Sequence, residues 1–327
     1  MTITRGLIAR SFAIAALALF AGQAFAQAWP AKPLRLIVNV GPGVPPDLVM
    51  RFVADKLATK LGRPFVVDNV LGGGGLTAGV AMVQSAPDGY TYYLGGVGIA
   101  ATDRYMFKSL PYDPDKDFAP VAVLYDSTTF GLAIHPELPV KSVADLIALA
   151  KSQPGKLSYG SEAAGVQAIT GQWFTHSAGI NMVWVPYKAP PQMLTDAVAG
   201  RVPVIFGSML QLQQFISSGK LRVIGISREK RLPAFPDIPA IAETFPGFRV
   251  AGVGILFAPT RTPNDIIQKL NGEIDIIVRS PEYQQRLQSF SFTSLAGAGS
   301  MAEIAQFMKS ERDNWANVFK SVKIEPQ

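Results

Sequence analysis

Residues 34–62 read LRLIVNVGPGVPPDLVMRFVADKLATKLG, and this stretch decides the fold. The apolar run 34–38 is typical of a buried parallel strand, and apolar residues recur at helical spacing from Val49 to Leu61. A turn rich in glycine and proline lies between them, and Gly62 supplies a helix stop. The stretch therefore predicts a strand whose end opens onto a helix N-terminus, where folds of this kind hold anions.

Strand and helix patterns alternate along almost the whole chain. Short apolar runs such as 90–95 and 157–160 alternate with helical patterns, and a second turn, residues 161–165, again leads from a strand into a helix. This order predicts an α/β fold with largely parallel sheets. Two extended apolar segments, 127–135 and 248–257, each join complete βα units, so we expect them to cross between two lobes.

The expected organisation is a signal peptide followed by two lobes. Residues 1–26 carry two arginines, an apolar run too short to span a membrane, and a small-residue cleavage site, which together are typical of a secretory signal. We expect lobe 1 to hold residues 27–129 and 249–327, and lobe 2 to hold residues 130–248. A ligand site between two lobes is the usual place for a small molecule.

Composition argues against several classes of function. The 327 residues include no cysteine, so no disulfide stabilises the exported fold, and the net charge of +6 comes from scattered cations, unlike a nucleic-acid surface. With only His135 and His176, a common zinc site lacks ligands, and residues 160–163 do not complete a Gly-x-Ser-x-Gly elbow. We expect a soluble periplasmic protein without metal or cofactor that is not an enzyme. An exported hydrolase is the minor alternative.

Seven blocks of sequence, in order along the chain, resemble one family. They are WPAKPLRLIV (29–38), LGRPFVVDN (61–69), APDGYT (86–91), LPYDPDKDFAP (110–120), VPYK (185–188), GKLR (219–222) and LPAFPDIP (232–239). This set resembles the Bug family, the TctC-like extracytoplasmic solute receptors of tripartite tricarboxylate transporters. The resemblance implies a type II periplasmic-binding-protein fold, two lobes joined by two crossing strands, that binds a small organic carboxylate and delivers it to membrane transporter subunits.

The resemblance also places the ligand between two strand-turn-helix motifs, one in each lobe. These motifs correspond to Val40, Gly41, Pro42, Gly43, Val44, Pro45 and Asp47 in the first lobe, and to Ser161, Glu162, Gly165, Val166 and Gln167 in the second. We add Tyr187, Gly207 and Ser208, which stand at the ends of neighbouring strands. Backbone amides at a helix N-terminus can hold a carboxylate without a dedicated arginine.

Departures from the family pattern bear on the ligand. Gly43-Val44-Pro45-Pro46 stands where many members have Gly-Gly-Ala-Thr, and proline has no N–H to donate, so the first turn is poorer in donors and more apolar. Gly207 stands where many members carry an acid, which argues against an amino-acid ligand. The sequence therefore favours a mono- or dicarboxylate with an aromatic or apolar body.

Other interpretations stay open. Asp47 is also suited to capping its helix or bracing its turn, Tyr187 to packing, and Glu162 to facing solvent. Ser161 and Ser208 can bond local backbone instead of a ligand. The protein, which we expect to be monomeric, could also present its solute to a sensor protein rather than to a transporter.

Overall fold

The computed structural model describes residues 29–126, 129–163, 165–232, 235–250, 252–290, 292–294 and 297–322. The predicted signal peptide and the first two residues of the predicted crossing segment 127–135 lie outside the described residues. Across these ranges, none of the helices combines the length and the apolar character needed to cross a membrane.

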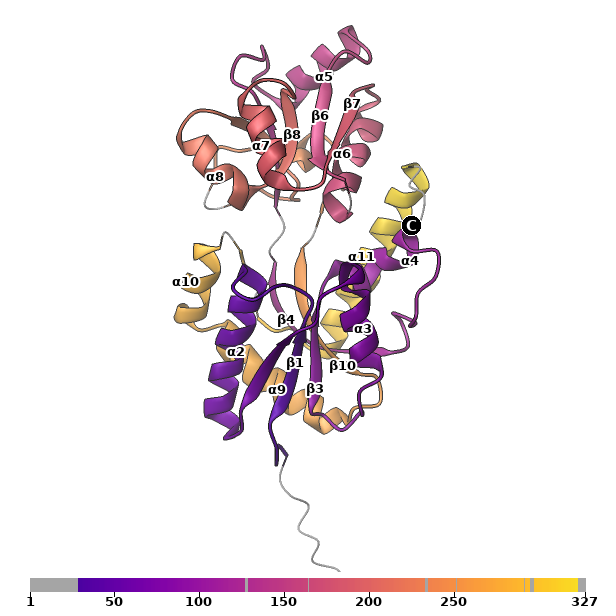
Figure 1. Ribbon diagram of the computed structural model, residues 1–327, viewed down its shortest axis with the longest axis vertical. Helices are drawn as coiled ribbons and strands as arrows, with labels where there is room; N and C mark the ends of the chain where they lie inside the picture. Colours follow the sequence, from indigo (N-terminus) through magenta and orange to yellow (C-terminus); the bar gives the residue numbers. More distant parts are fainter. Residues whose placement is uncertain are drawn as a thin grey trace, which may run out of the picture.

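The chain forms two lobes, and each lobe is built on one five-stranded sheet (Figure 1). The first sheet has the order β2 (Phe65–Asn69), β1 (Leu34–Val38), β3 (Thr91–Gly95), β10 (Val253–Pro259) and β4 (Phe118–Asp126). The second has the order β7 (Val183–Tyr187), β6 (Ser158–Glu162), β8 (Val204–Ser208), β5 (Phe130–Ile134) and β9 (Arg222–Ile226). The predicted α/β, two-lobed fold is confirmed.

Helices flank both sheets. In the first lobe they are α2 (Pro45–Leu61), α3 (Leu76–Val83), α4 (Asp103–Met106), α9 (Asn264–Val278), α10 (Pro281–Ser289) and α11 (Met301–Ser321). In the second they are α5 (Val143–Ser152), α6 (Gly165–Ala178), α7 (Pro190–Val198) and α8 (Met209–Ser217). Three short helical turns complete the described elements: η1 (Gly73–Gly75), η2 (Gly98–Thr102) and η3 (Ile241–Glu243).

One strand in each sheet runs against its neighbours. β10 is antiparallel to β3 and β4, and β5 is antiparallel to β8 and β9, whereas the β1–β2, β1–β3, β6–β7 and β6–β8 pairs are parallel. Each antiparallel strand is the first strand along the chain after it passes from one lobe to the other. The edge of each sheet that faces the other lobe is the edge at which the chain enters. A strand that begins there runs away from the other lobe, whereas the strands of the βα units end there.

The limits predicted for the two lobes stay a prediction.

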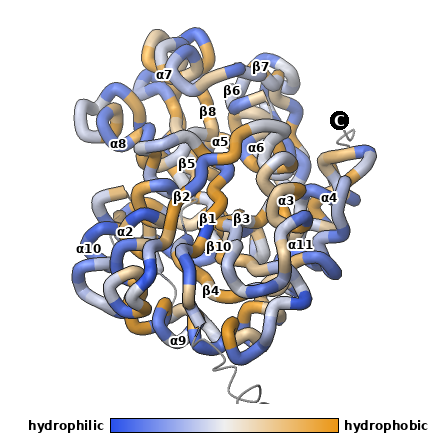
Figure 2. Tube along the Cα trace, turned by 60° about the horizontal axis from the view of Figure 1, so that its bottom comes forward, coloured by the Kyte–Doolittle hydropathy of each residue, from blue (hydrophilic) through white to orange (hydrophobic). Residues whose placement is uncertain are grey.

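The first strand-turn-helix motif forms as its sequence predicts. β1 is almost fully buried, as a strand between two parallel neighbours should be. α2 begins with Pro45 and Pro46 at its first two positions, where the fixed φ of proline suits a helix and its missing N–H costs nothing. Gly62 ends the helix in a left-handed conformation, with a φ of 68°, and its N–H donates to the Ala58 carbonyl. In Figure 2 hydrophobic residues follow strands such as β1 and β10 through the interior.

An aromatic cluster joins the two lobes beside the segments in which the chain passes from one sheet to the other, which we call the hinge. Trp315 of α11 is fully buried, and its ring centroid lies 6.3 Å from that of Trp173 on α6 of the second lobe. Trp173 in turn stacks on Phe248, with the centroids 4.3 Å apart. The C-terminal helix therefore packs against both lobes.

Replacing Trp315 with alanine should lower the free energy of unfolding by about 3–5 kcal/mol, because the buried indole leaves a cavity that its neighbours only partly fill. Urea unfolding followed by circular dichroism measures this loss. The control is Lys309→Ala on the exposed face of α11, where we expect a change within about 0.5 kcal/mol. A loss below about 1 kcal/mol for Trp315→Ala would show that this interior is not closely packed.

Candidate functional site

A cavity of about 280 Å³ lies where the two strand-turn-helix motifs approach each other. Lobe 1 contributes Asn39, Val40, Pro46, Gly74, Gly75, the backbone and side chains of residues 93–99, Asp103, Tyr125 and the segment 252–253; α6 of lobe 2 contributes Val166. The cavity thus lies at the ends of β1 and β3, which are neighbours in the first sheet. We call it the cleft cavity.

Asp47 holds the first turn in shape. Its side chain is fully buried; Oδ2 accepts bonds from the Gly43 N–H at 2.8 Å and the Arg51 Nε at 2.9 Å, and Oδ1 accepts one from the Asn69 amide at 2.8 Å. Burial by itself would raise the pKa of Asp47, but these bonds outweigh burial and lower it. Asp47 does not line the cleft cavity, so its geometry fits the interpretation of a turn brace.

The first turn has few amides to offer a ligand. Pro45 and Pro46 have no N–H, and the Gly43 N–H is taken by Asp47. The Leu48 N–H bonds the Val44 carbonyl inside the helix. These positions of the turn therefore offer no N–H to a ligand.

Two tyrosines supply hydrogen-bond donors at the cleft cavity. Tyr93 and Tyr125 are 1% and 5% exposed, both line the cleft cavity, and neither hydroxyl has a hydrogen-bond partner among the described residues. Burial raises the pKa of both far above neutrality, so the hydroxyls stay protonated and able to donate. The absent side chain of Gly75 leaves room nearby, since a Cβ there would lie 2.7 Å from the Asn39 amide nitrogen and 3.5 Å from the Tyr93 hydroxyl.

Asp103 is the one charged side chain among the residues that line the cleft cavity. Its Oδ2 accepts a hydrogen bond of 3.1 Å from the Tyr112 hydroxyl. Burial raises the pKa of Asp103 to about 6, and the bond from Tyr112 opposes part of that rise. The carboxyl therefore changes charge just below neutral pH.

The second turn contributes mainly through Val166. Ser161 is fully buried, and its Oγ donates to the Glu162 carbonyl at 3.1 Å and accepts from the Trp184 Nε1 at 2.8 Å. Burial raises the pKa of Glu162, which does not line the cleft cavity. Gln167 is 6% exposed and its Oε1 has no partner among the described residues. Gly165 begins α6, directly before Val166.

The other predicted residues lie at strand ends of the second lobe. The buried Tyr187 donates its hydroxyl to Asp196 at 2.8 Å, which favours its packing interpretation. Ser208 caps α8 by accepting from the Gln211 N–H, and Gly207 packs against Leu212. A second cavity of about 200 Å³, between the starts of α2 and α8, is lined by Pro45 and Ser208 among others.

The structure thus brings together part of the predicted set. Val40 and Val166 line the cleft cavity, and Pro45 and Ser208 line the second cavity. The remaining predicted residues line neither cavity, and their part in ligand binding stays a prediction. Sequence reasoning missed Asn39, Tyr93, Asp103 and Tyr125. The glycines at positions 95, 96 and 98, at the end of the strand predicted at 90–95 and directly after it, were the available signal for a binding loop.

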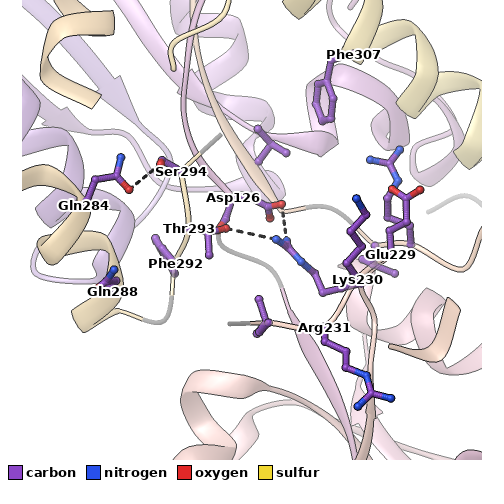
Figure 3. A pocket seen from close by; sticks show the side chains of 15 residues that line it. Asp126, Glu229, Lys230, Arg231, Gln284, Gln288, Phe292, Thr293, Ser294 and Phe307 are labelled. Atoms are coloured by element: carbon purple, nitrogen blue, oxygen red, sulfur yellow. Dashed lines mark hydrogen bonds and ion pairs between the residues drawn. The ribbon is translucent and has the colours of Figure 1, made fainter. Parts of the chain in front are cut away.

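A larger cavity, of about 560 Å³, lies at the hinge and is lined by none of the turn residues 40–47 or 161–167. Its central contact is an ion pair between Arg228, which follows β9, and Asp126, the last residue of β4; Arg228 also donates to Thr293 Oγ1 at 3.4 Å. Figure 3 shows this contact with Gln284 and Ser294 on one side and Glu229 and Lys230 on the other. Because Arg228 is paired across the lobes, we interpret the cavity as part of the hinge.

Comparisons with known proteins agree on one family. The family model described as the tripartite tricarboxylate transporter family receptor, TctC, matches residues 49–324. BugT of Bordetella pertussis is 30% identical over 323 residues, 98% of each chain. The structure of Rpa4515 of R. palustris with adipate has a TM-score of 0.76 and 31% identity, covering 91% of this chain and all of that one. MatC (Rpa3494) from Rhodopseudomonas palustris with bound malate has a TM-score of 0.71 and 27% identity, covering 89% and 99%.

Replacing Asp47 with asparagine should cost about 1–3 kcal/mol of unfolding free energy at neutral pH, because two charge-assisted bonds to the buried carboxylate are weakened. The folded-state pKa lies below the ordinary value of 3.8, so the stabilisation is present above that value and is lost as the pH falls through the folded pKa. Denaturant unfolding from neutral to strongly acidic pH should therefore show the gap to wild type closing at the acid end. The control is Asp55→Asn, at an exposed position of the same helix, and an equal loss in both variants would contradict the brace.

Proposed function

This chain belongs to the tripartite tricarboxylate transporter receptor family, and from that membership we propose that it is a periplasmic receptor for a small organic carboxylate with an apolar or aromatic body. Receptors of this family bind solutes and are not enzymes. The observation that carries the proposal is the cleft cavity, which is lined mainly by lobe 1 and is reached from lobe 2 by Val166. Relatives solved with adipate and with malate support a carboxylate as the ligand class.

The lining of the cleft cavity supports this ligand chemistry. Val40, Pro46 and Val166 supply apolar walls from both turns, as a hydrocarbon body requires. The hydroxyls of Tyr93 and Tyr125 are donors without a partner among the described residues. A hydrogen bond from such a donor to a carboxylate contributes about 1.5–3 kcal/mol. A few of them can therefore hold an anion although none of the described lysine, arginine or histidine residues lines the cavity.

The position of the cavity also supports ligand-driven closure. A ligand favours the closed state only to the extent that it touches both lobes in that state. Val166 on α6 faces the cavity from lobe 2, and the donors face it from lobe 1. We propose that the closed receptor then docks on membrane transporter subunits. Loss of uptake on deletion of the gene, with induction of the uptake genes intact, would support a transporter partner; loss of induction alone would indicate a sensor.

A thermal-shift screen of the processed protein, purified from the periplasm, tests the receptor proposal. The compounds are aromatic and aliphatic mono-, di- and tricarboxylates, amino acids and sugars. A ligand at about a hundred times its dissociation constant adds roughly 2.7 kcal/mol of stability, which raises the melting temperature measurably. We expect the largest rise with a carboxylate. A rise confined to sugars would contradict the proposal.

Replacing Tyr93 with phenylalanine should weaken binding of the best carboxylate by about tenfold, because it removes one donor to the anion while the buried ring stays in place. Isothermal titration calorimetry measures this change. The matched control is Tyr105→Phe: Tyr105 stacks on Phe319 outside the cleft cavity. Equal affinity of both variants and the wild type would show that the Tyr93 hydroxyl does not contact the ligand.

A further inference from the structure

The charge of the cleft cavity is unusual for a site that holds an anion. Among the described residues that line it, Asp103 at the start of α4 is the one ionisable side chain other than tyrosine, and none is a cation that could balance it. Tyr112 donates to Oδ2, while Oδ1 has no hydrogen-bond partner among the described residues. A carboxylate accepts more bonds than the one that Tyr112 supplies, so Asp103 has acceptor capacity left.

The acceptor capacity lies toward the cavity. A Cβ on Gly98 would stand 2.8 Å from Asp103 Oδ1, and Gly98 lines the cavity together with Asp103. Glycine at this position therefore leaves Oδ1 uncovered next to the space for a ligand. The donors Tyr93 and Tyr125 lie on strands of the same lobe, β3 and β4. The lobe 1 wall thus offers donors from the sheet and one acidic acceptor from the η2–α4 corner.

We propose that Asp103 determines ligand specificity: the receptor selects a monocarboxylate that also carries a hydrogen-bond donor, a hydroxyl or an ammonium group, facing Asp103, and it disfavours dicarboxylates. This inference rests on the proposed function and names its ligand class. The physical reason is that two carboxylates brought together in a partly desolvated cavity repel strongly, whereas a donor would satisfy the uncovered oxygen. The chain would then differ in ligand from Rpa4515 and MatC, whose structures hold adipate and malate.

The geometry also implies a pH dependence with a definite sign. The titratable groups that face Asp103 are Tyr112, from the loop after α4, and Tyr93, from β3; burial raises the pKa of both, so they stay neutral. Asp103, with its pKa raised to about 6 by burial, is charged at pH values well above that and neutral below it. A neutral carboxyl can donate to a carboxylate. Discrimination against dicarboxylates should therefore be strong in mildly alkaline solution and fade in acid.

The test uses two matched series of acids that differ only at the end opposite the carboxylate. One is hexanoate, 6-hydroxyhexanoate, 6-aminohexanoate and adipate; the other is 4-methylbenzoate, 4-(hydroxymethyl)benzoate, 4-(aminomethyl)benzoate and terephthalate. Calorimetric titrations compare the wild type, Asp103→Asn and the control Asp88→Asn, a surface carboxylate paired with Lys32. Each protein is titrated with ligand at mildly alkaline and at mildly acidic pH. Because Asp103→Asn lacks the carboxyl at position 103, its change in affinity with pH shows how much protonation of the acids themselves contributes.

In the wild type at alkaline pH, we expect an acid with a hydroxyl or ammonium end to bind at least about tenfold tighter than the dicarboxylate of its series. Asp103→Asn should remove most of this preference, Asp88→Asn should keep it, and acidification should weaken it in the wild type more than in Asp103→Asn. Thermal unfolding at alkaline pH checks that Asp103→Asn folds; it should melt no lower than the wild type, because a partly buried charge is removed.

Two results would overturn the inference. If the dicarboxylates bind the wild type at least as tightly as the donor-bearing acids and Asp103→Asn leaves that ratio unchanged, Asp103 does not face the ligand, although the receptor function stands. If no acid of either series binds either protein, this inference is wrong, and the thermal-shift screen decides separately whether the receptor function stands.

Discussion

The passage of the chain between two sheets is the constraint on which the rest of this structure depends. After β4 the chain leaves the first sheet and forms β5 in the second, and it returns much later as β10. β5 and β10 begin at the edge of their sheet that faces the other lobe, and each is antiparallel to its neighbours. The other strands of both sheets therefore end at that edge. The turns after β1, β3 and β6 are thereby directed at one another. The position of the cleft cavity is therefore set by the path of the chain between the two sheets, and the side chains determine only its lining.

The polar groups near the cleft cavity have two different roles: some stabilise the first turn, and others line the cavity. The carboxylate of Asp47 is fully buried and satisfied by Gly43, Arg51 and Asn69, so it stabilises the first turn and is not available to a ligand. Two prolines remove further donors from the same turn. The polar side chains that line the cavity are Asn39, Tyr93, Asp103 and Tyr125, and they come from the strands beside it and from the segments that follow them. A turn with two prolines and a Gly43 N–H already bonded to Asp47 supports the proposal that side chains contribute to ligand specificity.

The fold and the site were not equally predictable from the sequence. The strand-turn-helix motif at residues 34–62 could be predicted because its signals are local: a short apolar run, prolines at the helix start and a glycine stop. The polar groups of the cavity could not be predicted from local patterns. Tyr93 and Asp103 lie at the same cavity as Val40 because β3 pairs with β1, and this pairing is not visible in the sequence. In the sequence, a tyrosine within an apolar strand pattern predicts a residue of the hydrophobic core. Only the structure shows that its hydroxyl lies at a cavity and has no partner among the described residues.

The same reasoning shows why net charge is a poor guide to the ligand of this chain. The excess of cations suggests attraction for anions, yet none of the cations in the described part of the chain lines the cleft cavity. At the hinge, Arg228 and Arg249 are only partly exposed, and each is paired with an acid, Asp126 and Glu311. Their charges therefore contribute to holding the segments that join the lobes, and little of their field is left for a distant anion. The lining of the cleft cavity carries no charge among the described residues apart from Asp103. In the function proposed above, the tyrosine hydroxyls attract the carboxylate and Asp103 limits which second group can enter.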